Sequence, residues 1–377
     1  MSSHSIVCPF CPLACDDVTV NTAATDVGCE LADAELAVAL GAPPARLESD
    51  LLRAIDLPTL AGKLQLSPRP LVEANGLAIE ECKQLHRLVQ TYGLRLCRSA
   101  TPTELALAQS VSRDGMIAAT LAEICHRADL ILTFGDLQRP WPRLGERVSA
   151  GSASRIDLGT ASLSLLAELQ TARLQTGTGA KQRISPPTEI ASIMDRLRRS
   201  RYTGIVVGAD AFDPGTEVIA AELLNRWIQQ INERLPAEAN SDDGDSQPKS
   251  RAALLWVSAE QNLQSVFRWR SNQDAASTWT ATPTADIRIG SPRLASGHPV
   301  GRVQLQIGGI DPGVDHAHAY LPASQPGVHH RGTTIRGDGT VSLPLLKWSD
   351  SDLPPRLERL ESVLRLTQPP HQPHSVG

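Results

Sequence analysis

Four cysteines near the start of the chain are the residues best suited to chemistry. Cys8, Cys11 and Cys15 have the spacing C-x2-C-x3-C, and Cys29 follows fourteen residues after Cys15. Four thiolates can hold a 4Fe–4S cluster or a tetrahedral zinc ion. Structural zinc sites usually present two close pairs of ligands, whereas three cysteines lie together here and one stands apart. The spacing favours a 4Fe–4S cluster over zinc. The alternative is a reduced loop without metal, and Cys29 is the least constrained ligand.

The other candidate groups have simpler interpretations. Three further cysteines are spread through predicted helices and strands and are expected to be small core residues: Cys82, Cys97 and Cys125. Four histidines lie in a Gly- and Pro-rich segment and are interpreted as polar loop residues rather than a metal site: His316, His318, His329 and His330.

Three arginines spaced four residues apart, Arg139, Arg143 and Arg147, could grip an anionic carrier. Pro140 and Pro142 argue against a regular helix there, so a solvated basic loop is the simpler interpretation.

Composition limits the class of protein. A chain of 377 residues with 41% apolar residues is expected to form two or three domains with real cores. A net charge of -5 argues against nucleic-acid or membrane-surface binding. We expect a cytoplasmic protein, because the sequence shows neither a signal-peptide pattern nor an apolar run of membrane-spanning length. In that compartment, clustered cysteines are more often metal ligands than disulfides.

Short apolar runs alternate with helical patterns over most of the chain. Strands are expected at 70–74, 94–97, 129–135, 155–158, 203–208, 251–257, 285–289 and 303–307. Helices are expected at 30–40, 45–55, 77–91, from Thr101, and at 121–127, 190–197, 220–231 and 355–366. A tight turn at 336–339 is expected to join two short strands. The pattern predicts an α/β fold with Rossmann-like doubly wound parallel sheets and a small N-terminal cysteine-rich segment.

Proline-rich and polar stretches suggest boundaries that divide the chain into four consecutive parts. These are a cysteine-rich segment with helices at 1–65, a first α/β domain at 66–185, a second α/β domain at 186–346, and a C-terminal helix and tail at 347–377. The acidic stretch 236–250 inside the second domain has no apolar anchor and is expected to be a disordered insertion.

The layout resembles the molybdopterin oxidoreductases, and among them the B subunit of formylmethanofuran dehydrogenase. The cysteine loop has that family's form C-x2-C-x3-C-Asp-Asp, with Asp16 and Asp17 after Cys15. Further similarity lies in Gly76 and Cys82 of the first strand–helix unit, in the strand 128–135, and in the late loop 320–337 with His330, Arg331, Gly332 and Thr333.

The departures from this family concern its redox site. The dehydrogenase places a cysteine or selenocysteine on tungsten or molybdenum, but in the corresponding region only Cys97 could serve, and it is out of register. The run 136–143 lacks the family's Cys-Asn-Pro, and His329 to Gly332 stand where the family has an acidic residue before Gly-Thr. The resemblance therefore implies that tungstopterin or molybdopterin is absent and that the subunit's own catalytic metal site is lost.

The resemblance is strongest to the B subunit of the bacterial formyltransferase/hydrolase complex, in which the redox function has been lost. It implies a non-redox subunit in tetrahydromethanopterin-linked one-carbon metabolism. That subunit would scaffold a hetero-oligomer with A-, C- and formyltransferase-type subunits, and help bind a methanofuran-like formyl carrier. Two alternatives stay open: an active tungsten or molybdenum dehydrogenase subunit that uses Cys97, and an Fe–S electron-transfer module based on Cys8, Cys11, Cys15 and Cys29.

Overall fold

The computed structural model describes most of the chain. The described residues are 4–20, 27–41, 43–52, 56–97, 101–138, 141–175, 187–208, 210–233, 251–256, 285–290 and 301–368. The expected insertion at 236–250 and the C-terminal tail beyond 368 lie outside them. The chain divides into two compact units, Met1–Ala100 with Ser258–Gly377, and Thr101–Val257.

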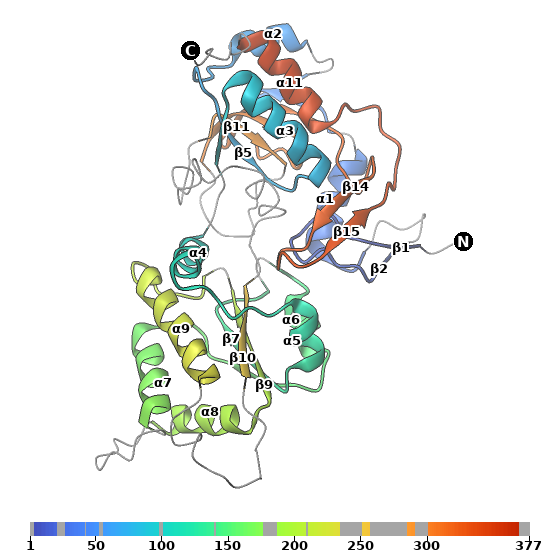
Figure 1. Ribbon diagram of the computed structural model, residues 1–377. Coiled ribbons are helices and arrows are strands. Elements are labelled where there is room, and N and C mark those ends of the chain that lie inside the picture. The colour runs from blue at the N-terminus through green and yellow to red at the C-terminus, as the bar shows by residue number, and fades with distance from the viewer. Residues whose placement is uncertain are drawn as a thin grey trace, which may run out of the picture. The chain divides into compact units, whose positions relative to one another are not determined.

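The first unit is built on a sheet whose described strands come from both ends of the chain (Figure 1). In sheet order they are β4 (Asp50–Leu52), β3 (Ala45–Leu47), β13 (Ala317–Leu321), β12 (Val303–Ile307), β11 (Ile287–Ile289), β5 (Leu71–Ala74) and β6 (Arg95–Cys97). The five strands from β13 to β6 are parallel, and β3 and β4 add an antiparallel hairpin at one edge.

One face of this sheet is apolar and carries three helices. They are α2 (Leu57–Lys63), α3 (Ile79–Tyr92) and α11 (Arg356–Thr367), and α11 contacts both of the others (Figure 1). Val72, Ile287 and Leu305 of the strands pack with Leu85 of α3 and Leu360 of α11 in one buried cluster. Burial of such side chains contributes about 1.5–3 kcal/mol each and supplies the main driving force for this unit.

Two small antiparallel pairs complete the first unit. The first is β1 (His4–Ile6) with β2 (Val18–Val20), followed by helix α1 (Glu30–Gly41). The second is β14 (Gly332–Ile335) with β15 (Ser342–Leu345), which confirms the hairpin expected around 336–339.

The second unit has a smaller sheet in which all described strands are parallel. In sheet order they are β10 (Arg251–Trp256), β9 (Tyr202–Val207), β7 (Leu130–Phe134) and β8 (Ser154–Asp157). Helices α4 (Pro102–Asp114), α7 (Leu163–Gln175), α8 (Thr188–Arg199) and α9 (Glu217–Asn232) lie on one face, and α5 (Leu121–Arg127) and α6 (Leu144–Ser149) on the other (Figure 1). Helices on both faces make this a doubly wound sheet.

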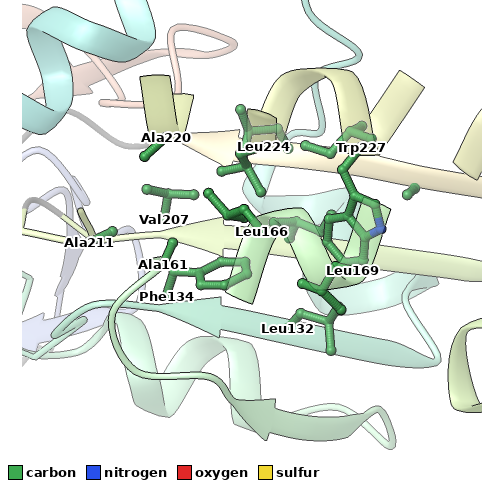
Figure 2. Packing of buried hydrophobic residues seen from close by; sticks show 14 of the residues in the cluster. Leu132, Phe134, Ala161, Leu166, Leu169, Val207, Ala211, Ala220, Leu224 and Trp227 are labelled. Atoms are coloured by element: carbon green, nitrogen blue, oxygen red, sulfur yellow. The ribbon is translucent and has the colours of Figure 1, made fainter. Parts of the chain in front are cut away.

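The core of the second unit lies between its sheet and α7 and α9. Figure 2 shows Phe134 of β7 and Val207 of β9 packed against Leu166 of α7 and Trp227 of α9. Aromatic residues are scarce in the chain, at 3%, so most of this cluster is aliphatic. The structure thus confirms the predicted α/β fold with parallel doubly wound sheets and an N-terminal cysteine-rich segment.

Two features differ from the sequence-based expectation. The predicted helix at 45–55 is wrong, because Ala45–Leu47 and Asp50–Leu52 form β3 and β4, and β3 is anchored to β13 through the pair Tyr320 and Arg46. The division of the chain also differs from the four consecutive parts expected, because β5 bonds in register with β11, so residues far apart in sequence share one sheet. Among helices of the described residues, none has the length and apolar character that a bilayer crossing requires.

Candidate functional site

The cysteine loop lies between β1 and β2 and is closed by its own backbone. The N–H of Cys8 donates to the carbonyl of Cys15 across 2.8 Å, and the N–H of Ala14 donates to the carbonyl of Cys11 across 3.0 Å. Ala14 adopts a left-handed conformation with φ of 44°, which turns the chain between the second and third thiol. The result is a tight loop in which Cys8, Cys11 and Cys15 are buried, at 7%, 6% and 4% exposed.

Cys29 reaches the site from a different element. It directly precedes α1, and its carbonyl accepts a hydrogen bond from the N–H of Asp33 across 2.9 Å. Its side chain is half-buried, unlike the three loop cysteines, and all seven cysteines of the chain are free thiols. The helix start thus fixes the backbone of the expected fourth ligand.

The pKa of Cys8 is influenced by the other three predicted ligands. The pKa of Cys8 lies well above its usual value, first because of burial and next because of Cys11, with smaller contributions from Cys15 and Cys29. A backbone hydrogen bond at Phe10 acts in the opposite direction. Each of the other three cysteines therefore lies within electrostatic range of Cys8. Burial of several thiols around one point disfavours thiolates unless a cation compensates them.

The four cysteines have suitable ligand chemistry but do not form a metal-binding group among the residues that the structure describes. Four cysteine thiols have the chemistry of a 4Fe–4S ligand set. Within the described ranges, however, no three His, Cys, Asp or Glu side chains are arranged as a group that could hold a metal ion. The ligand set Cys8, Cys11, Cys15 and Cys29 therefore stays a prediction.

The hairpin β14–β15 holds the cysteine loop from outside. The N–H of Gly337 donates to the carbonyl of Pro12 across 2.6 Å, and Arg336 pairs with Asp16 across 3.0 Å. Val7 and Ala14 of the loop pack with Leu345 of β15. Gly327 comes so close to the loop that a Cβ atom there would lie 2.8 Å from Cβ of Pro9. The loop's geometry thus depends on residues more than 300 positions away in sequence.

A second polar cluster, which the sequence analysis missed, crosses the sheet of the first unit. Six neighbouring strands each contribute one residue in register, and these six define the polar row: Arg46, Tyr320, Gln306, Arg288, Glu73 and Cys97. Each is at most 4% exposed. They occupy the face opposite the apolar cluster, because side chains alternate along a strand. A charged or amide residue inside an apolar strand, as in Ile-Arg-Ile at 287–289, was the available signal.

An ion pair and hydrogen bonds from a side-chain amide satisfy much of the hydrogen-bonding capacity of the polar row. Arg288 donates from Nε to Glu73 across 2.7 Å, and the Gln306 amide donates to the carbonyls of Gly290 and Gly308. Among the described residues, the Arg288 Nη1 and Gln306 Oε1 atoms are buried without a hydrogen-bond partner. Each unsatisfied buried group destabilises the folded state by about 1–3 kcal/mol. The unsatisfied atoms of the polar row therefore lower the stability of the first unit.

The remaining candidate residues do not assemble into a site. Cys82 packs in the apolar core, where burial, and next the charge of Glu81, raise the pKa of its thiol to about 12. Cys97 is buried in a small apolar cluster with Ala285, Val303 and Ala317. In the second unit, the Cys125 thiol donates to the carbonyl of Arg147 across 3.3 Å.

The histidines singled out in the sequence form no group of metal ligands among the described residues, and two of the arginines lie at helix α6. The ring of His329 accepts from the N–H of Gln325 across 3.0 Å and contacts the carbonyl of Ala39, and burial lowers its pKa, so it is a neutral structural residue. Arg139 lies outside the described residues. Arg143 precedes α6 and pairs with Glu146. Arg147 lies within α6, so the interpretation of this segment as a solvated basic loop is wrong at that residue.

Comparisons with known proteins give one informative likeness. No protein-family model matches the sequence, and no curated protein matches it. Among solved structures, the fold is similar to a chain in the X-ray crystal structure of the formyltransferase/hydrolase complex from Methylorubrum extorquens with methylofuran. The match has a TM-score of 0.54 at 18% identity and covers 85% of this chain and 98% of that chain. The chain therefore shares, over most of its length, the fold of a protein in that complex.

Proposed function

We propose that this chain is a non-redox, B-type subunit of a formyltransferase/hydrolase complex in one-carbon metabolism. The observation that carries the proposal is the shared fold, which extends over 98% of a chain in such a complex. The N-terminal cysteine loop and the parallel α/β sheets of the two units add support, because they are the layout expected for the B subunit. The chain contributes a scaffold, and the formyl chemistry belongs to other subunits.

The environment of the thiols supports a non-redox role. Cys97, the only residue positioned to replace the metal-ligating cysteine of the dehydrogenase, is 3% exposed and packs in an apolar cluster. A thiol in such surroundings behaves as a small hydrophobe rather than as a thiolate ligand. The alternative function, a tungsten or molybdenum dehydrogenase subunit, requires Cys97 as a metal ligand. It is disfavoured because the neighbours of Cys97 in its buried cluster are apolar, whereas Cys8 shares one loop with two further cysteines.

The cysteine loop is proposed to hold a 4Fe–4S cluster through Cys8, Cys11, Cys15 and Cys29. When bound, such a cluster stores one electron, and it also crosslinks the loop to the start of α1. The spacing of the four cysteines, three of them buried in one loop, supports this proposal and also favours the Fe–S electron-transfer module as a second candidate function. In either case Arg336, paired with Asp16, places a positive charge beside the loop.

The proposed partners are A-, C- and formyltransferase-type subunits in a cytoplasmic hetero-oligomer, together with a methanofuran-like carrier. The methylofuran in the similar crystal structure is the reason for proposing this carrier class. The chain's net charge of -5 gives no support for nucleic acid as a partner.

Co-expression with these three subunit types tests the assignment. We expect one hetero-oligomer that transfers and hydrolyses formyl groups and contains neither tungsten, molybdenum nor pterin by elemental and cofactor analysis. Cys97→Ser should leave the activity of the complex unchanged. Stoichiometric tungsten or molybdenum that disappears in Cys97→Ser would contradict the proposal and establish the dehydrogenase alternative.

Iron and acid-labile sulfide, measured on anaerobically purified complex, test the cluster separately. We expect both to fall at least several-fold in Cys8→Ser and to stay unchanged in Cys125→Ser, since Cys125 lies in the other unit. Loss of formyl transfer in Cys8→Ser, with the complex still assembled, would favour an electron-transfer or catalytic role of the loop over a scaffold role.

A further inference from the structure

The sheet of the first unit has a clear topological switch point. The chain runs from β5 to β6 on one side of β5, and the next parallel strand, β11, lies on the other side. In open parallel α/β sheets, ligands bind outside the carboxyl ends of the strands at this point. The start of the helix after the first strand, here α3 after β5, is where anionic groups of such ligands are held.

A side chain from the far end of the sequence occupies this position. Arg356, the first residue of α11, is 2% exposed, and its Nη2 donates to the carbonyl of Gly76 in the turn after β5 across 2.8 Å. Its Nε donates to Oε1 of Glu81 across 3.1 Å, and its Nη2 donates to Oε2 of the same carboxylate. The guanidinium thus binds Glu81 through two nitrogens, which is the geometry in which arginine binds free carboxylates and phosphates.

The backbone around the guanidinium is shaped to admit it. Gly290 follows β11 with φ of 83°, and a Cβ atom there would lie 3.3 Å from Nη1 of Arg356 and 2.3 Å from the carbonyl of Asn75. Gly308 follows β12 with φ of 66°, and its Cβ would lie 3.0 Å from Cδ of Arg356. The Arg356 side chain therefore lies beside the carboxyl ends of β5, β11 and β12 and takes up the space that glycines leave there.

Glu81 fulfils the role of an anion at the helix start. Its Oε2 accepts the N–H of Ala78 across 2.9 Å, and its own carboxylate lies in the first turn of α3. A negative charge at this end compensates the partial positive charge of the helix dipole. Glu81 is itself 6% exposed, so this carboxylate is enclosed rather than solvated.

We infer that the Glu81–Arg356 pair is an internal substitute for an anionic ligand, which closes the switch-point site of the first unit to nucleotides. Helix α11 supplies the guanidinium that occupies this position. The inference extends the proposed non-redox function, because it names the residues that take the place of a cofactor. It rests on contacts within the first unit and can fail or hold independently of the complex to which the chain belongs.

Chemical rescue tests the substitution. Glu81→Ala in the full chain leaves the Arg356 guanidinium buried and opposite a space of carboxylate size. We expect a lower thermal midpoint, and 50 mM sodium acetate should raise the midpoint of this variant by about 2–4 °C. The same concentration of sodium chloride should raise it by less than half as much. The matched control is Glu361→Ala, which removes the partner of the exposed Arg365 on the same helix and should show no difference between acetate and chloride.

Binding to the wild-type protein provides a measurement that does not depend on recovery of a variant. Equilibrium dialysis with inorganic pyrophosphate and with GDP should give no saturable binding. Saturable, stoichiometric binding of either probe to the wild type would overturn the inference, and so would equal responses of Glu81→Ala to acetate and chloride. Tungsten or molybdenum in the assembled complex would instead refute the proposed function, so the two failures are distinguishable.

Discussion

Arg288 on β11 and Glu73 on β5 form an ion pair of 2.7 Å across neighbouring strands, although their side chains are only 1% and 4% exposed. The register places the two residues directly side by side, and Nη2 of Arg288 also donates to the carbonyl of Gly301 across 3.1 Å. This pair joins the strand contributed by the N-terminal part of the chain to one contributed by the C-terminal part. It therefore links the two sequence segments of the first unit from inside the sheet.

Removal of one partner of this pair should destabilise the first unit strongly. In Glu73→Ala the Arg288 charge stays buried without its counter-ion, which typically costs about 3–5 kcal/mol. The double variant Glu73→Leu with Arg288→Met should be less damaging than Glu73→Ala, because no uncompensated charge is left. Urea unfolding followed by circular dichroism measures both. The control is Asp195→Ala, whose ion pair with Arg199 is exposed and should contribute less than about 1 kcal/mol.

A glycine pair isolates the contact between the cysteine loop and the segment that leads into β14. Gly327 and Gly313 have nearly the same left-handed φ, 81° and 82°, so alanine should cost about 1–2 kcal/mol of backbone strain at either position. Only at Gly327 does the new Cβ also meet Pro9, at 2.8 Å, whereas nothing lies within 4 Å at Gly313. We expect Gly327→Ala to be the less stable variant. Its loop thiols should react faster with a thiol reagent such as dithiobis-nitrobenzoate, and equal rates in the two variants would contradict the contact.

The second unit should lose stability in acid through Asp129. Burial, the largest influence, raises the pKa of this carboxyl, but hydrogen bonds from Ser200 and from the N–H groups of Arg201 and Tyr202 outweigh it and leave the pKa below its usual value. Because the folded-state pKa is depressed, the stabilisation is fully present above the unfolded pKa of about 4 and is lost as the pH falls through the folded value.

Asp129→Asn removes the contribution of this carboxylate to the pH dependence of stability. Comparison of the variant with the wild type therefore measures that contribution. The stability difference between wild type and Asp129→Asn should be largest near neutral pH and should shrink as the pH is lowered below about 4. Urea midpoints between pH 3 and pH 7 record it. A difference that stays constant over this range would show that the carboxylate's charge does not contribute.

Local pattern predicted much of the secondary structure, because the decisive interactions are close in sequence. Thr101 caps α4 and forms a capping box with Glu104, as the Thr-Pro-Thr-Glu sequence indicated. The helix α2 was missed although Asp56 caps it and Pro58 stands in its first turn, because the proline was interpreted as a boundary. Asp56 and Pro58 together are therefore the sequence pattern of a helix start rather than of a domain boundary.

Other features could not be predicted, because they depend on distant partners. Glu73 and Arg288 are 215 residues apart, and neither strand shows alone that its charge will be neutralised inside a sheet. Arg356 and Glu81 are 275 residues apart. β13 lies within a segment rich in Gly, His and Pro, and only its position between β12 and β3 makes it a strand of the main sheet. For the cysteines, the ligand set indicated by the spacing stays a prediction, and the spacing could not indicate the contacts of the loop with the hairpin β14–β15.

Arg46 shows how such a distant contact overrides local helix propensity. Its Nε and Nη2 bind the two carboxylate oxygens of Asp311, each across 2.7 Å, and its Nη1 donates to the carbonyls of Glu48 and Ala317. One guanidinium therefore joins the β3–β4 hairpin to the residues before and within β13. Lysine has the same charge but cannot form this planar, two-nitrogen contact.

Arg46→Lys should therefore loosen the hairpin without unfolding the unit. Hydrogen bonds to charged groups contribute about 1.5–3 kcal/mol each to stability, so a loss of about 2 kcal/mol is expected. Amide hydrogen exchange should quicken in 45–52 more than in β5 or β12. Arg365→Lys, at an exposed pair with Glu361 on α11, should change neither. Unchanged protection of 45–52 in Arg46→Lys would mean that strand pairing with β13 alone, and not the guanidinium, keeps these residues out of a helix.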